Sequence, residues 1–144
     1  MTREILSVAL AIASIAGVSA QDKPNFAGKW KQDNSFSSVT ITVEGSKMTV
    51  SNTIAGNSES TVYLLDGTPS KKTFEGPDGP MVNVYTSTWD ADVLVTTIKT
   101  AFGSTMIEKR SIQPDGTMRI QNALILEGKP SPPPGPGLVL KKIQ

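Results

Sequence analysis

The chain has 144 residues and a formal net charge of +1. Its basic residues stand alone or in isolated pairs and form no block, so the chain lacks the basic footprint that nucleic-acid binding requires. Neither cysteine nor histidine occurs in the sequence. This excludes disulfides, Ser-His-Asp and Cys-His catalysis, and zinc sites of the usual kind. Stability must therefore come from core packing and from sheet closure.

Residues 1–20 have the pattern of a removable export signal. An apolar run extends from Ile5 to Val18, and Val18-Ser19-Ala20 places small residues where a signal peptidase cleaves. The run is shorter than the roughly 20 residues that a membrane-spanning helix needs. An N-terminal membrane anchor or a buried helix is the alternative. We expect an exported protein, periplasmic or secreted, with no membrane insertion after cleavage and a single domain over residues 21–144.

The sequence of that domain predicts a succession of short β-strands. Val, Ile, Thr and aromatic residues, which fit a pleated surface, fill the runs. Several runs alternate with the period of two that marks a half-buried strand. The predicted strands are Gly28–Gln32, Val39–Val43, Met48–Ile54, Ser60–Leu65, Lys72–Phe74, Met81–Trp89, Val93–Thr100, Ser104–Gln113, Thr117–Leu126 and Leu138–Ile143.

Turn residues separate these runs. Asp66-Gly67 and Asp115-Gly116 supply the positive φ that tight hairpins need. Links this short join antiparallel neighbours, whereas parallel strands need long crossovers. We therefore expect an all-β, antiparallel, up-and-down (meander) barrel of about 8–10 strands, because closure removes exposed edges. A two-layer sandwich is the alternative.

Three stretches resemble the small exported bacterial lipocalin-like β-barrel proteins. Residues 25–33 (NFAGKWKQD) look like that group's N-F-x-G-x-W-x-x-D opening, and residues 63–67 (YLLDG) look like its Y-x-L-D-G hairpin. Residues 88–97 (TWDADVLVTT) and 114–116 (PDG) look like its W-D-G-D-x-L-x-x-T and P-D-G hairpins. The order matches over most of residues 25–143. The resemblance implies a calycin-type barrel with an apolar ligand site, but it implies no substrate.

The chain departs from this pattern in two places. Ala91 stands where glycine is expected in the W-D-G-D hairpin. In true lipocalins an arginine near the last strand packs over the tryptophan of the G-x-W motif, whereas the final strand here offers Lys141 and Lys142. We therefore expect the floor of the barrel to close differently.

Aromatic residues mark the candidate ligand site. Trp30 is expected either to plug one barrel end or to form a wall of the lumen, and Tyr63 is expected at the lumen or its rim. Asn122 interrupts the apolar face Met118–Leu126, so it either anchors a ligand or satisfies a neighbouring backbone group. Met81, Tyr85 and Trp89 share one face of their strand. The candidate ligand-binding residues are Trp30, Tyr63, Met81, Tyr85, Trp89 and Asn122.

The leading hypothesis is a barrel that binds a small hydrophobic or amphipathic molecule in its lumen. The alternative is a barrel filled by its own side chains that serves as a structural or protein-interaction module. The Pro-rich segment 130–137 is either a docking motif for a protein partner or a rigid surface linker. We expect no cofactor.

The acidic residues do not predict an enzyme or a metal site. Most of them lie in turns, where aspartate bonds the local backbone, and Asp90-Ala91-Asp92 lacks the further acids of a calcium loop. A carboxylate-dependent hydrolase, which needs two acids, is the alternative, with Glu108 central in its strand. Glu108 and Arg110 share one strand face, and we expect them to form cross-strand pairs on the outer surface.

Overall fold

The computed structural model describes residues 22–130 and 135–144. The predicted export signal, residues 1–20, lies outside this part of the chain, as does the centre of the Pro-rich segment, residues 131–134. Within the described residues, no helix is long and apolar enough to cross a membrane. The described ends of the Pro-rich segment are held on the neighbouring strand, where Arg119 donates to the Pro136 carbonyl and Gln121 to the Gly135 carbonyl.

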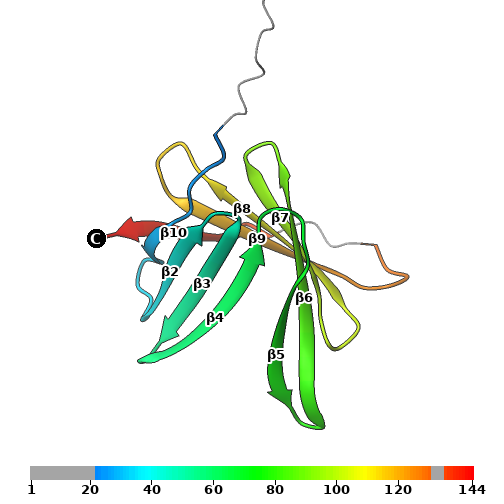
Figure 1. Cartoon of the computed structure of the whole chain (residues 1–144). Coiled ribbons are helices and arrows are strands. Elements are labelled where there is room, and N and C mark those ends of the chain that lie inside the picture. Colours follow the sequence, from blue (N-terminus) through cyan, green and yellow to red (C-terminus); the bar gives the residue numbers. More distant parts are fainter. Residues whose placement is uncertain (1–21, 131–134) are drawn as a thin grey trace, which may run out of the picture.

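The described residues form ten antiparallel strands. They are β1 (Gly28–Lys31), β2 (Ser37–Glu44), β3 (Lys47–Ile54), β4 (Asn57–Leu64), β5 (Ser70–Gly76), β6 (Gly79–Asp90), β7 (Val93–Lys99), β8 (Thr105–Ile112), β9 (Met118–Ile125) and β10 (Leu138–Ile143). Successive strands pair along the sheet order β4-β3-β2-β1-β10-β9-β8-β7-β6-β5. Because β1 pairs with both β2 and β10, the first and last strands close the sheet on one side (Figure 1). The predicted up-and-down barrel is confirmed.

The barrel is nearly closed, and its interruption lies between β4 and β5, the two ends of the sheet order. Side chains bridge this interruption near its narrow end. The Ser70 hydroxyl donates to the Val62 carbonyl, and the Lys72 ammonium lies 2.8 Å from the Glu59 carboxylate and 3.1 Å from the Thr61 hydroxyl. Farther along, the β5–β6 hairpin diverges from β4 (Figure 1).

Because successive strands run in opposite directions, the loops that join them alternate between the two ends of the barrel. The N-terminal end carries residues 22–27 and the turns after β2, β4, β6 and β8. The opposite end carries the β3–β4, β5–β6 and β7–β8 hairpin tips and the connections after β1 and β9. Large exposed apolar side chains of the described residues, such as Phe36, Ile54 and Phe102, lie toward this opposite end.

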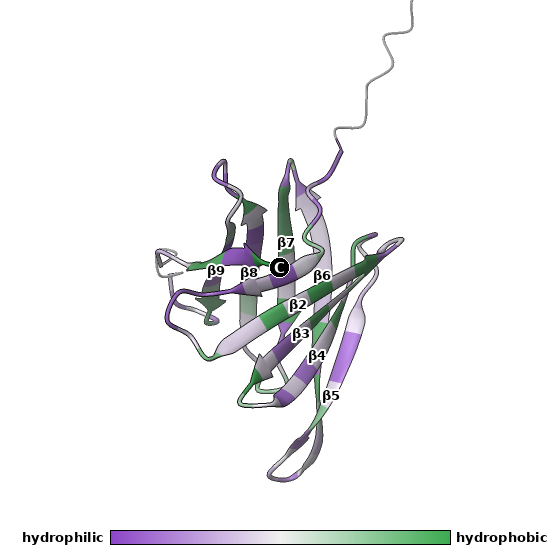
Figure 2. Cartoon of the chain, turned by 90° about the vertical axis from the view of Figure 1, so that its left-hand side faces the viewer, coloured by the Kyte–Doolittle hydropathy of each residue, from purple (hydrophilic) through white to green (hydrophobic). Residues whose placement is uncertain are grey.

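The core follows from the period-two pattern of the strands. Hydrophobic and hydrophilic residues alternate along β2, β3 and β4 (Figure 2), and the apolar set turns inward. The buried hydrophobic residues are Phe26, Trp30, Ile41, Met48, Val50, Tyr63, Tyr85, Leu94, Ile98, Met118 and Leu140. These residues come from the N-terminal segment and from eight strands, so one core joins both halves of the barrel.

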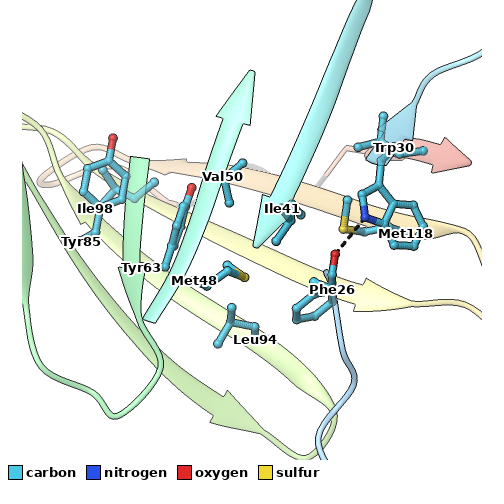
Figure 3. Packing of buried hydrophobic residues seen from close by; sticks show 11 residues of the cluster. Phe26, Trp30, Ile41, Met48, Val50, Tyr63, Tyr85, Leu94, Ile98 and Met118 are labelled. Carbon is cyan, nitrogen blue, oxygen red and sulfur yellow. Dashed lines mark hydrogen bonds between the residues drawn. The ribbon is translucent and has the colours of Figure 1, made fainter. Parts of the chain in front are cut away.

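The N-terminal segment plugs its end of the barrel. Trp30 is 2% exposed, and its indole Nε1 donates to the Phe26 carbonyl at 2.9 Å (Figure 3). The Phe26 ring stacks on Trp89 with 5.9 Å between centroids. Outside this stack, the Lys23 ammonium donates to the Ala91 carbonyl and lies 5.5 Å from the Trp89 ring centroid. The segment is therefore fixed by a buried aromatic stack and by a cation at the surface.

Lys142, on the last strand, lies over Trp30. Its ammonium lies 5.6 Å from the Trp30 ring centroid, within the range of a cation–π interaction. Gly28 makes room for this lysine, because a Cβ at Gly28 would lie 2.6 Å from Lys142 Cε. The sequence predicts a barrel floor that closes differently from that of lipocalins. In the structure, the cation above Trp30 is a lysine of β10.

The hairpin between β6 and β7 has a left-handed residue at Ala91, whose φ is 53°. A glycine adopts this conformation without a steric penalty, whereas an L-residue loses about 1–2 kcal/mol there. The position that departs from the W-D-G-D pattern therefore keeps the backbone conformation that glycine would favour.

We expect Ala91→Gly to raise the free energy of unfolding by about 0.5–1 kcal/mol, since the relief of strain exceeds the entropy that glycine adds to the unfolded chain. Chemical denaturation followed by circular dichroism measures the change. Ala123→Gly, in the middle of β9, is the matched control and should destabilise by about 0.5–1 kcal/mol. Equal losses in both variants would contradict a left-handed Ala91.

Candidate functional site

A pocket of about 190 Å³ lies inside the barrel between β2–β4 and β8–β10. Its walls are partly apolar and partly polar. The apolar wall consists of Val39, Val50, Ile120, Leu138 and Leu140. The polar wall consists of Asn52, Thr61, Tyr63, Glu108, Arg110 and Asn122.

The pocket reaches solvent toward the end of the barrel that lies opposite the N-terminal plug. Asn52, Asn122 and Leu138 line it and are exposed, and all three lie near the strand ends at that side. Its inner part is formed by Tyr63, Glu108 and Arg110, which are buried. The pocket is therefore a short recess with a polar inner end.

Glu108 and Arg110 form an ion pair in the barrel interior. Arg110 Nη2 lies 2.9 Å from Glu108 Oε1, and the Arg110 side chain is 3% exposed. Arg110 is paired in register with Leu94, and Glu108 with Thr96, both of which are buried. Since directly opposed residues of an antiparallel pair share a face, both charges point inward.

The expected outer location of this pair is wrong. The outward face of β8 carries Ile107 and Lys109, so each face of the strand mixes apolar and charged residues. Period-two alternation groups Glu108 with Arg110, but a mixed strand does not reveal which of its faces is buried. The register with β7 and β9 decides the matter.

Tyr63 completes the polar inner end of the pocket. Its hydroxyl lies 3.5 Å from Glu108 Oε2, and its ring faces the Arg110 guanidinium with 5.7 Å between the ring centroid and Cζ. Tyr85 packs edge-to-face on Tyr63 with 5.5 Å between centroids (Figure 3). Burial, reinforced by the charge of Glu108, raises the pKa of Tyr63. Tyr63 therefore stays neutral at physiological pH and keeps a hydroxyl proton to donate.

Arg110 retains unused hydrogen-bonding capacity. Nη2 donates to Glu108, and Nη1 makes a weak contact with the Met118 sulfur at 3.6 Å. Its buried Nε has no acceptor among the described residues. A buried donor without a partner is unfavourable by about 1–3 kcal/mol. Arg110 also lines the pocket, so the residue at its inner end is one whose hydrogen-bonding capacity is not fully used.

A second recess, of about 400 Å³, lies at the N-terminal end. The plug itself forms much of its wall, together with the turn after β2, Leu65 and Trp89. It lacks a buried polar cluster of the kind found in the interior pocket, within the residues that line it. Its geometry is that of a surface groove beside the plug.

The structure distributes the predicted ligand-binding residues over several places. Tyr63 and Asn122 line the interior pocket, and Tyr85 lies directly behind Tyr63. Trp89 lines the groove at the N-terminal end, and Trp30 is packed in the core beside Phe26.

Met81 lies apart from both recesses. It is opposite Phe74 in the β5–β6 hairpin, and its sulfur packs over Gly76 near the tip. The sequence marks neither Thr61 nor Arg110 as a site residue, and it suggests Glu108 only as a catalytic acid or as a member of an outer pair with Arg110. The signal for the pair was present in two opposite charges at positions i and i+2 of one strand, between Met106 and Ile112.

No model of a known protein family matches the sequence, and no curated protein matches it either. Solved structures do share the fold. A secretory abundant heat soluble protein from Ramazzottius varieornatus aligns over 82% of this chain and 95% of its own, with a TM-score of 0.58 and 12% identity. A protein described as the REP1-NXSQ fatty acid transporter aligns over 82% and 96%, with a TM-score of 0.56 and 13% identity.

Secretory abundant heat soluble protein 4 from the same organism aligns over 82% of this chain and 94% of its own, with a TM-score of 0.54 and 15% identity. At these identities the likeness shows the fold alone. The chain thus shares its nearly closed, antiparallel β-barrel fold with these proteins, and the pocket and ion pair described above lie in the interior of its barrel.

Proposed function

We propose that the protein binds a small amphipathic molecule in the interior pocket, with the polar head at Tyr63, Glu108 and Arg110. The observation that carries this proposal is a buried, incompletely bonded polar cluster at the inner end of a recess that has one apolar wall. Ligand sites in proteins combine apolar walls with a few convergent polar groups in this way. The shared fold with a protein described as a fatty acid transporter supports an amphipathic ligand, without indicating its head group.

The size of the pocket limits the ligand. Its volume of about 190 Å³ is below the roughly 300–1,000 Å³ of typical ligand pockets. A ligand therefore fits with its head inside and with its tail running past Val50, Leu138 and Leu140 toward the exposed rim. The interrupted β4–β5 side, bridged by Lys72 and Ser70, gives the barrel a place to widen.

We also propose that the protein works outside the cytoplasm after removal of residues 1–20, in the periplasm or the medium, as the resemblance to exported bacterial barrels implies. The rival function is a structural or protein-interaction module, in which the polar cluster is only a core network and the Pro-rich segment contacts a partner.

Filling the pocket should abolish binding without unfolding the barrel. Val50 lines the pocket, and Val50→Phe places a ring where the ligand tail would lie, so we expect at least about a tenfold loss of affinity for ten-carbon amphiphiles. Isothermal titration calorimetry of the protein with 1-decanol, decanoate and decylamine measures this.

Val82→Phe, on β6 and outside the pocket lining, is the matched control and should bind as the unmodified protein does. If none of the three amphiphiles binds the unmodified protein, the proposed function is wrong and the interaction-module alternative stands. If Val50→Phe binds normally, the ligand does not occupy the interior pocket.

A further inference from the structure

We propose that the interior pocket selects amphiphiles with an uncharged hydroxyl head and rejects carboxylates and amines. This inference rests on the proposed function and names its ligand class. It follows from the charge balance at Arg110, whose positive charge is already neutralised by a neighbouring carboxylate. Its guanidinium is already paired with Glu108 at 2.9 Å, and both groups line the pocket.

The charges around the pocket cancel. The remaining polar wall residues are the uncharged Asn52, Thr61, Tyr63 and Asn122. A further cation, Lys72, donates to the wall residue Thr61 but is itself 2.8 Å from the Glu59 carboxylate. An anionic head brought to the inner end would meet the Glu108 carboxylate, and a cationic head would meet Arg110. Either one would lose its hydration without gaining an unpaired counter-charge, which is strongly unfavourable in a buried site.

A hydroxyl group fits the hydrogen-bonding capacity that is left. Arg110 Nε needs an acceptor, and Glu108 Oε2 has only a long contact, at 3.5 Å, from the Tyr63 hydroxyl. A hydroxyl carries a proton and two lone pairs, so it has both a donor for the Glu108 carboxylate and an acceptor for the Arg110 guanidinium. A carboxylate has no proton to donate, and an ammonium has no lone pair with which to accept.

The test compares three ligands with the same tail. We expect 1-decanol to bind the unmodified protein at least about tenfold more tightly than decanoate or decylamine in calorimetry at pH 7.5. Glu108→Gln keeps the shape of the side chain but leaves Arg110 with net charge, so the decanoate-to-decanol affinity ratio should rise about tenfold or more. Arg110→Gln should raise the decylamine-to-decanol ratio in the same way.

The control Glu75→Gln changes the net charge equally at an exposed position of β5 and should leave all three affinities unchanged. The double variant Glu108→Gln/Arg110→Gln contains no buried charge, so it stays testable if either single variant fails to fold. It should bind decanol and retain its preference over the charged ligands.

The inference is overturned if the unmodified protein prefers decanoate or decylamine, or if Glu108→Gln leaves the ratios unchanged. Those results would leave the proposed function intact, because binding would still occur in the pocket and would still be lost in Val50→Phe. Absence of binding by all three ligands overturns the proposed function, and this inference falls with it.

Discussion

Replacing Arg110 with methionine will lower the free energy of unfolding by about 3–5 kcal/mol. The substitution leaves the Glu108 carboxylate in the barrel interior without its partner at 2.9 Å, and removing one member of a buried ion pair has an effect of about this size. Urea denaturation at pH 7, followed by far-UV circular dichroism, measures the loss. Lys109→Met, on the exposed face of the same strand, should change stability by no more than about 0.5 kcal/mol.

The double variant Glu108→Leu/Arg110→Met decides whether the loss comes from an unpaired charge. Apolar replacement of both partners of a buried pair is often neutral or stabilising, so the double variant should recover most of the stability that Arg110→Met loses. If the effects of Glu108→Leu and Arg110→Met are additive, the two charges are not coupled. That result would contradict an ion pair between Glu108 and Arg110 in the barrel interior.

The second large effect is expected at the plug. Trp30→Ala removes a side chain that is 2% exposed and packs beneath Lys142 and beside Phe26. Truncation of a buried aromatic residue of this size lowers the free energy of unfolding by about 3–5 kcal/mol. The loss should appear in denaturant unfolding followed by the fluorescence of the remaining Trp89.

Trp30→Phe separates packing from hydrogen bonding in the plug. It keeps most of the ring but deletes the Nε1–H that bonds the Phe26 carbonyl at 2.9 Å, so a smaller loss of about 1–3 kcal/mol is expected. Phe36→Ala, at a side chain that is 98% exposed, is the control and should be nearly neutral. A neutral Trp30→Ala would show that the N-terminal segment does not seal the barrel.

Much of the fold could be predicted from local patterns. Alternating runs such as Val39–Val43 and the Asp-Gly turns specify strands and hairpins directly, because side-chain alternation and positive φ are local properties. Strand limits shifted by a few residues, as between the predicted Lys72–Phe74 and the observed Ser70–Gly76. The end residues of β5 carry little apolar signal, because it is their pairing with β6 that makes them part of the strand.

The site was harder to predict because it depends on contacts between distant strands. Tyr63 and Glu108 are 45 positions apart in the sequence and contact each other in the structure. The residues around either one do not indicate that contact. The same holds for Lys142 of β10, which lies over Trp30 although the two residues are far apart in the sequence. The alternation of side chains along β8 places Glu108 and Arg110 on the same face of the strand. Whether that face points into the barrel is decided by the pairing of β8 with β7 and β9.

The central claim, that an uncharged head group binds at the inner end of the interior pocket, is tested most directly by nuclear magnetic resonance of the Arg110 Nε–H group. Titration with 1-decanol should shift this signal in a saturable manner, together with resonances of Tyr63, because Nε gains an acceptor. Shifts confined to the groove around Trp89 and Leu65, with the Arg110 Nε–H signal unmoved, would contradict the account.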